Sequence, residues 1–102
     1  MPQAYSNLID GEMVSTAKTF DVVNPATEEA IGTVPACGKE ELDRAVAAAR
    51  RAFGTWKKTP LEERQRVVQG IAAAIKSNAD ELYRLLTSEQ GKPHQQAQME
   101  IY

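Results

Sequence analysis

Apolar side chains recur at helical spacing in three successive segments of the chain, between Lys39 and Gln90. A stripe of this kind forms one face of an amphipathic helix, and that face needs another surface to cover it. The stripes are Leu42, Ala45, Val46, Ala49 and Phe53 in the first segment, Val67, Val68, Ile71 and Ile75 in the second, and Leu82, Tyr83, Leu85 and Leu86 in the third. The pattern therefore predicts three helices, each with one face packed on a partner.

Residues at the ends of these segments indicate where each helix begins and ends. Gly38 is an acceptable N-cap for the first helix, and Gly54 is expected to end it. Thr59 is expected to cap the second helix through its hydroxyl, with Pro60 in the first helical position. For the third helix, we expect Asn78 as the N-cap and Gly91 at the C-terminal stop.

A fourth helical pattern opens at Pro93 and runs through Ala97 and Ile101 to Tyr102. It shows neither a glycine nor a basic last turn at its end, both of which are typical of natural helix ends. We therefore expect the chain to be cut inside a helix, and the helices to be one layer of a larger α/β protein.

The first third of the chain predicts two β-hairpins. Residues 5–9 and 12–14 flank Asp10-Gly11, a pair typical of tight hairpin turns with positive φ. Residues 20–23 and 30–34 are rich in β-branched and aromatic side chains, and a turn sequence from Asn24 to Thr27 separates them. We expect Pro35 to end the last strand, because proline has no N–H to donate.

Composition and charge narrow the functional classes. A chain of 102 residues has room for one small domain, and a net charge of −2 does not suit nucleic-acid binding. The longest apolar run, Ile71–Ile75, is too short to span a bilayer. No secretory signal pattern is visible at the N-terminus, and the single cysteine, Cys37, excludes an intrachain disulfide. These features predict a cytoplasmic protein.

No catalytic constellation is visible in the sequence, and four residues remain to be weighed. Cys37 precedes a helix N-terminus, where a thiol can be activated, but packing as a small apolar side chain is the favoured interpretation. We expect His94 to lie on the surface rather than act as a base. Trp56 is interpreted as a cover over the base of the first two helices, with an interface anchor as the alternative. Glu89, an acid at a helix C-terminus, is either an exposed mismatch or a cation ligand.

Several stretches of the sequence, in order and with the right spacing, resemble the opening of the NAD(P)-dependent aldehyde dehydrogenase superfamily. They are NLIDGE (7–12), FDVVNPATEE (20–29), IGTVP (31–35), DRAVAAAR (43–50), Phe53 with Trp56, Pro60 with Glu63-Arg64, ADEL (79–82) and EQGKP (89–93). The resemblance covers nearly the whole chain. No single motif carries it, but the ordered set is specific.

The resemblance implies an α/β fold with a Rossmann-like cofactor domain, a catalytic domain and an oligomerisation arm. Residues 1–102 would be the N-terminal portion of the cofactor domain, with β-hairpins over 1–37 and a helical layer over 38–102. The catalytic domain would be absent. The rest of the same polypeptide would then be the partner of this layer, and the full-length protein would be a homo-oligomer, a dimer or a tetramer.

The activity implied by the resemblance is oxidation of an aldehyde to a carboxylic acid with NAD or NADP. A cysteine thiolate attacks the carbonyl, hydride passes to the nicotinamide, and a glutamate-activated water releases the thioester. Neither the nucleophile, the general base nor any cofactor-binding residue of the family maps onto this sequence, and Cys37 does not match the nucleophile's motif. We therefore expect this chain by itself to be inactive and to bind no nicotinamide cofactor.

One family site maps onto the chain in part. Some members hold a monovalent cation with backbone carbonyls from the strand before Asn-Pro and with an acid before Gly-Lys-Pro. By resemblance these ligands would be Val22 or Val23, together with Glu89. Oxygen ligands of this kind suit a hard cation.

A second hypothesis stays open from the residues alone. The chain would then be a self-standing, non-catalytic helical module that pairs its apolar faces with a partner or with a second copy. That hypothesis predicts a cooperative fold with a defined oligomeric state, whereas a piece of a larger enzyme would associate through uncovered apolar stripes.

Overall fold

The computed structural model describes residues 3–102, which form five strands and four helices. The strands are β1 (Gln3–Ala4), β2 (Asn7–Ile9), β3 (Glu12–Val14), β4 (Thr19–Val23) and β5 (Ala30–Pro35). The helices are α1 (Lys39–Trp56), α2 (Leu61–Ser77), α3 (Ala79–Gln90) and α4 (His94–Ile101). Two compact units are present, one comprising residues up to Val22 with Ala30–Thr59, and the other Val23–Glu29 with Pro60–Tyr102.

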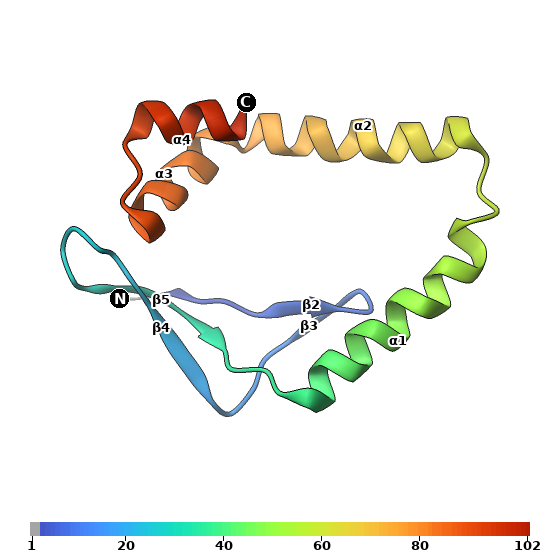
Figure 1. Ribbon diagram of the computed structural model, residues 1–102, viewed down its shortest axis with the longest axis horizontal. Helices are drawn as coiled ribbons and strands as arrows, with labels where there is room; N and C mark the ends of the chain where they lie inside the picture. The colour runs from blue at the N-terminus through green and yellow to red at the C-terminus, as the bar shows by residue number, and fades with distance from the viewer. Residues whose placement is uncertain (1–2) are drawn as a thin grey trace. The chain divides into compact units, whose positions relative to one another are not determined.

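The first hairpin forms as the Asp-Gly pair predicts (Figure 1). β2 and β3 pair antiparallel, with Ile9 opposite Glu12 across the turn. Asp10 has φ 53° and Gly11 has φ 76°, so both central residues adopt the left-handed region that a type I′ turn requires. The strand begins at Asn7 rather than at residue 5, because Tyr5 instead donates its N–H to the Thr33 carbonyl at 2.9 Å.

The second predicted hairpin is also present, within a three-stranded sheet of order β1-β5-β4. The third strand, β1, pairs parallel to β5, with Gln3 opposite Gly32 and Ala4 opposite Thr33. The sequence did not reveal β1, because two residues are too few to show an alternating pattern. Pro35 is the last residue of β5 and is buried.

Helix α1 starts where predicted and ends later. Gly38 is its N-cap, and the Gly38 N–H donates to the Glu41 carboxylate at 3.0 Å. The predicted stop at Gly54 is wrong, since the helix continues to Trp56. A single glycine inside a helix costs only about 1 kcal/mol relative to alanine, which seventeen other helical residues readily offset.

The predicted capping of α2 by Thr59 is also wrong. Pro60 occupies the N-cap position, with φ −57° and ψ 147°, and the helix proper starts at Leu61. The Thr59 hydroxyl instead donates back to the Thr55 carbonyl at 3.3 Å, which satisfies a carbonyl at the end of α1. At the other end of α2, Asn78 is the N-cap residue of α3, but its side-chain amide donates to the Ala74 carbonyl at 2.8 Å.

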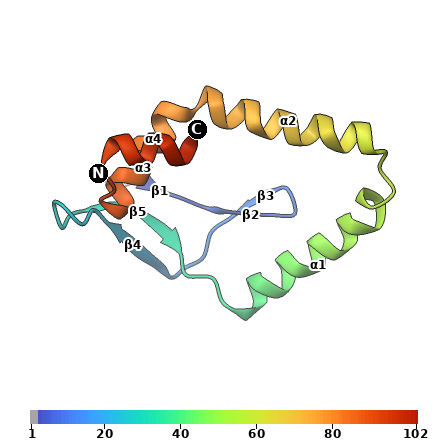
Figure 2. The same cartoon turned by 45° about the horizontal axis from the view of Figure 1, so that its top comes forward.

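Helices α3 and α4 pack against each other, and both ribbon views show them side by side (Figures 1 and 2). These two helices carry three of the four buried apolar side chains of the described residues, namely Ala79, Tyr83 and Ala97. Ala97 is fully buried and the Tyr83 side chain is 6% exposed. They form a small core in this unit of the structure.

The apolar stripes of α1 and α2 are exposed. Neither helix has a buried residue. On α1 the exposed fraction is 63% for Leu42 and 58% for Phe53, and on α2 it is 61% for Val68 and 56% for Ile71. The helical periodicity is therefore confirmed, while the covering surface that each stripe needs is not supplied by residues 3–102.

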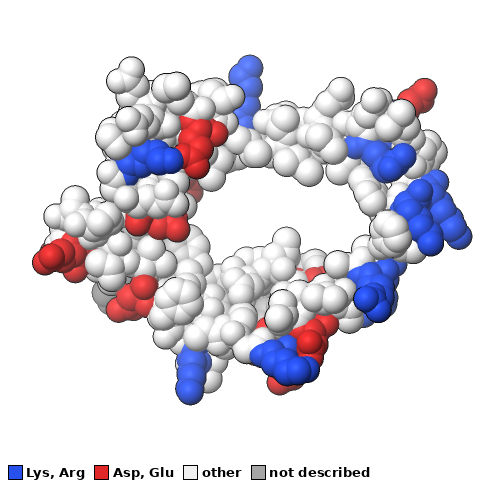
Figure 3. All heavy atoms as spheres, viewed as in Figure 1, with Lys and Arg blue, Asp and Glu red and all other residues white. Residues whose placement is uncertain are grey.

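Charged side chains of both signs lie on the surface. Figure 3 shows basic side chains gathered around the C-terminal end of α1, in the part of the chain that carries Lys57 and Lys58. Within the described residues, no helix is both long enough and apolar enough to cross a membrane.

Candidate functional site

The loop between β4 and β5 is held in shape by its own hydrogen bonds. The Asn24 N–H donates to the Glu29 carbonyl, and the Asn24 carbonyl accepts from the Glu28 N–H at 2.7 Å. The Asn24 side-chain oxygen also accepts from the Ala26 N–H at 2.9 Å, an Asx turn. Glu28 adopts φ 64°, a left-handed conformation uncommon for its residue type. Residues 24–29 thus form a defined loop directly after Val23.

The end of α3 is defined by Gly91. This residue has φ 75°, and its N–H donates to the Thr87 carbonyl at 2.8 Å, which closes the last turn of the helix. The predicted glycine stop is therefore confirmed. The hydroxyl of Thr87, in the same turn, is buried and has no hydrogen-bond partner among the described residues.

The loop and the helix end are close to each other within one unit of the structure. A Cβ placed on Gly91 would lie 3.0 Å from Pro25 Cγ and 3.8 Å from Pro25 Cβ. The Pro25 ring therefore occupies the space beside Gly91. The loop that follows Val23 and the helix end that carries Glu89 are neighbours.

Two of the three predicted cation ligands belong to this unit. Glu89 is the penultimate residue of α3 and is exposed, while Val23 is the last residue of β4. The Glu89 carboxylate takes part in none of the ion pairs of the described residues, which are Lys39–Asp43, Arg51–Asp10 and Lys92–Glu100. Val22 falls in the other unit and stays a sequence-based expectation.

His94 lies on the surface, as predicted, in the first turn of α4. Its ring packs edge-on against the Tyr83 ring, with a centroid distance of 5.6 Å and an interplanar angle of 72°. The Arg84 guanidinium lies 5.2 Å from the same tyrosine ring. The Tyr83–His94 contact joins α3 to α4, whereas the Arg84 contact lies within α3. His94 thus has a packing role that its spacing in the sequence did not indicate.

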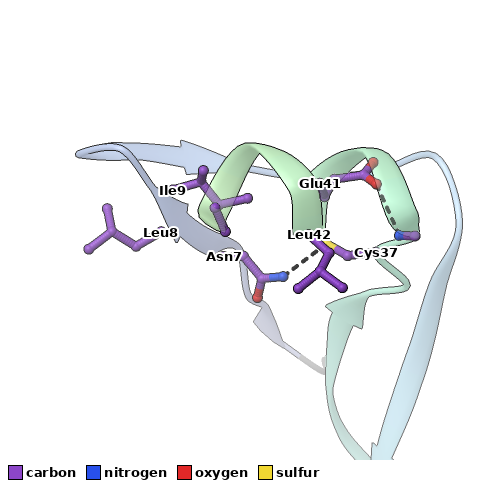
Figure 4. Close-up of a pocket in the computed structure, with 8 residues that line it drawn as sticks. Asn7, Leu8, Ile9, Cys37, Glu41 and Leu42 are labelled. Carbon is purple, nitrogen blue, oxygen red and sulfur yellow. Dashed lines mark hydrogen bonds between the residues drawn. The ribbon is translucent and has the colours of Figure 1, made fainter. Parts of the chain in front are cut away.

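Cys37 lies in a pocket of about 470 Å³ between β2 and the start of α1 (Figure 4). The thiol is exposed, which corrects the expectation that it packs as a small apolar side chain. The Asn7 side-chain amide donates to Cys37 Sγ at 2.9 Å. No histidine lines the pocket, so no general base is placed beside this thiol among the described residues.

Trp56 is the last residue of α1 rather than part of a separate link, and its side chain is 41% exposed. The described residues contain no group of three or more histidine, cysteine or acidic side chains that could hold a metal. A site made of one carboxylate and backbone carbonyls would not form such a group, so this finding leaves the cation prediction at Glu89 open.

A profile of the family described as "Aldehyde dehydrogenase family" matches residues 13–102. Among the similar proteins, malonate-semialdehyde dehydrogenase 1 of Geobacillus thermodenitrificans is 45% identical over 101 residues, covering 97% of this chain and 21% of that protein. The acylating, mitochondrial methylmalonate-semialdehyde dehydrogenase of Arabidopsis thaliana is 39% identical and is covered over 17% of its length. The chain thus spans about a fifth of the length of the relatives it matches.

Solved structures match with the same coverage. Lactaldehyde dehydrogenase from Escherichia coli superimposes with a TM-score of 0.95 at 36% identity, over 99% of this chain and 22% of that one. An NAD-dependent aldehyde dehydrogenase from Sinorhizobium meliloti gives 0.93 at 37% identity, over 99% and 21%. The family match and the structural superpositions both cover nearly the whole of the described chain, and the chain belongs to the aldehyde dehydrogenase family.

Proposed function

We propose that residues 1–102 are the N-terminal portion of the cofactor-binding domain of an enzyme that oxidises an aldehyde to a carboxylic acid with NAD(P)+. The observation that carries this proposal is the family match along nearly the whole chain, combined with the exposed apolar stripes of α1 and α2. Helices that pack on a sheet bury their apolar faces against it, and these faces are exposed when the sheet is not present.

In this proposal the chain contributes structure rather than a reacting group. Cys37, the one thiol, lies against Asn7 with no base in its pocket, and it does not occupy the motif of the family's nucleophile. When bound, the nicotinamide would accept the hydride of the aldehyde, and residues beyond this segment would hold it. The residues described here would stabilise the domain that binds it.

The names of the relatives indicate which substrates to try first. Several of them are named as malonate- or methylmalonate-semialdehyde dehydrogenases, and one solved structure as a lactaldehyde dehydrogenase. A small aldehyde, with or without a carboxylate, is therefore the substrate class we propose, with a homo-oligomer as the assembled enzyme and the cytoplasm as its location.

The test compares the complete gene product with residues 1–102 expressed alone. Reduction of NAD+ and of NADP+ is followed with propanal and with malonate semialdehyde. The complete product is expected to reduce one nicotinamide, and the 102-residue chain to reduce neither. An inactive, well-folded complete product would contradict the proposal, and so would turnover by the 102 residues alone.

The alternative, a self-standing interaction module, predicts that residues 1–102 alone are monodisperse and unfold cooperatively. The exposed stripes on α1 and α2 favour association of the isolated chain instead. Size-exclusion chromatography with light scattering distinguishes the two.

We further propose that the Val23 carbonyl and the Glu89 carboxylate bind a monovalent cation, with Val22 as the alternative carbonyl ligand. The donor set fits such an ion, because both groups offer oxygen and the carboxylate supplies the charge. Support comes from the Pro25–Gly91 proximity, which brings the loop after Val23 to the helix end that carries Glu89. An anomalous difference map from thallium-soaked crystals of the complete protein, if empty between these groups, would remove the site.

A further inference from the structure

Two glycines of this chain share one backbone conformation but differ in their surroundings. Gly11 has φ 76° and Gly91 has φ 75°. A Cβ on Gly11 would meet nothing within 4 Å, whereas a Cβ on Gly91 would lie 3.0 Å from Pro25 Cγ. Glycine is therefore needed at Gly11 for its φ alone, and at Gly91 both for its φ and for the approach of the Pro25 ring.

The loop that carries Pro25 is held in shape by hydrogen bonds between its own residues. Its ends are joined by the hydrogen bond from the Asn24 N–H to the Glu29 carbonyl, and the Asn24 side chain fixes the turn at Ala26. Proline itself restricts the backbone at the contact. A shift of the Pro25 ring would therefore move the segment that begins at Val23.

We propose that Gly91 is a positioning residue for the cation site, acting through its contact with Pro25. The contact holds the loop after Val23 against the end of α3, so that the Val23 carbonyl and the Glu89 carboxylate are kept at a separation that one ion can bridge. This inference rests on the cation site proposed above. A side chain at position 91 pushes the loop away and separates the two ligands.

The test measures thallium(I) binding to the complete gene product at constant ionic strength, by thallium NMR or calorimetry, for wild type, Gly91→Ala and Gly11→Ala. Both variants place alanine at the same positive φ, so the strain of that conformation is matched between them. Gly91→Ala is expected to weaken thallium binding by about tenfold or more, the size typical of changes to groups that orient metal ligands. Gly11→Ala is expected to leave the affinity within about twofold of wild type.

Two further variants separate positioning from folding. Pro25→Ala adds no heavy atom and should also weaken thallium binding, because the ring that holds the loop is gone. In Pro25→Ala/Gly91→Ala the clash is relieved, and binding should be no weaker than in either single variant. These variants keep the proposal testable if Gly91→Ala does not fold.

The results that overturn the inference are distinct from those that overturn the site. If wild type binds no thallium, the cation site fails and the positioning role fails with it. If wild type binds thallium and folded Gly91→Ala or Pro25→Ala binds it equally well, the site stands and the positioning role is wrong. Neither result bears on aldehyde oxidation, which the turnover test addresses separately.

Discussion

The Tyr5 ring lies directly over Gly32, so that a Cβ on Gly32 would be 2.7 Å from Tyr5 Cε2 and 3.0 Å from the Gln3 carbonyl oxygen. This approach joins β1 to β5, since Gly32 is the residue opposite Gln3 in the parallel pair. The hydrogen bond from the Tyr5 N–H to the Thr33 carbonyl adds a second link between this segment and β5. Because Gly32 has no side chain, Tyr5 and β1 can approach β5 closely, although the two segments are far apart in the sequence.

Gly32→Ala should lower the free energy of unfolding by about 1–3 kcal/mol, because the added methyl group must displace the Tyr5 ring or the backbone of β1. Chemical denaturation of the complete gene product measures the loss. Tyr5→Ala/Gly32→Ala is the control, since removing the ring should make the alanine at position 32 less costly. A fully stable Gly32→Ala variant would show that β1 does not pair this closely.

Gly54→Ala and Gly70→Ala should have the opposite effect in residues 1–102 expressed alone. Both glycines lie inside helices, and a Cβ on either would meet nothing within 4 Å. Each substitution should stabilise its helix by about 0.5–1 kcal/mol, because alanine loses less backbone entropy. Circular dichroism gives the helical content, which should be higher in each variant than in the unsubstituted chain at the same temperature and concentration. A loss of stability in the complete gene product would show that another surface approaches α1 or α2 at these positions.

The start of α1 should be sensitive to acid. The pKa of Glu41 is lowered mainly by the hydrogen bond that the Gly38 N–H donates to the Glu41 carboxylate. The backbone N–H of Glu41 and the Arg44 charge act in the same direction. Because the folded pKa lies below that of the unfolded chain, Glu41 stabilises the fold above the ordinary glutamate value of about 4.3. This contribution is lost as the pH falls through the folded pKa.

Glu41→Gln should remove that part of the pH dependence, because glutamine can accept the same hydrogen bond but does not titrate. Thermal unfolding at a series of pH values on either side of about 4.3 is the measurement. Glu40→Gln, in the same turn but without the bond to Gly38, is the matched control and should keep the dependence. An unchanged pH profile in Glu41→Gln would contradict the assignment.

The ion pair between Arg51 Nη2 and Asp10 Oδ2, at 2.8 Å, links α1 to the first hairpin turn. Both side chains are about two-thirds exposed, at 64% and 65%, so the pair should contribute no more than about 1 kcal/mol. Asp10→Asn should therefore have a small effect, since asparagine also tolerates the φ of 53° at this position.

Asp10→Ala should cost more than Asp10→Asn, because alanine lacks the local hydrogen bonding that makes left-handed φ accessible. The difference, about 1 kcal/mol, measures the turn rather than the ion pair. Urea denaturation of the two variants and of Arg51→Ala separates the contributions. Equal losses in Asp10→Asn and Asp10→Ala would indicate that the ion pair dominates.

Local chemistry accounts for the parts of the fold that were correctly predicted. The Asp10-Gly11 turn, the N-cap at Gly38 and the stop at Gly91 depend on neighbouring residues alone. Two helix boundaries were predicted wrongly, the start of α2 and the end of α1. The Thr59 hydroxyl bonds Thr55 rather than capping α2, and Gly54 does not outweigh the rest of its helix.

For the proposed cation site, the sequence indicates which residues offer oxygen ligands, but not that these residues lie near one another. Glu89 stood out as an acid at a helix C-terminus, whereas Val22 or Val23 was indicated only by the family resemblance. The proximity of their segments depends on Pro25 and Gly91, which are 66 positions apart along the chain (91 − 25). No periodic pattern carries that information.

The sequence by itself determined the helical segments, both hairpins and the family, because backbone preferences and ordered motifs act over a few residues. Tertiary structure alone decided the parallel pairing of β1 with β5, the core around Tyr83 and Ala97, and the approach of Pro25 to Gly91. These features join distant segments, and they depend on which surfaces meet and how closely. A methyl group at Gly32 would crowd the contact between β1 and β5, and one at Gly91 would crowd the approach of Pro25.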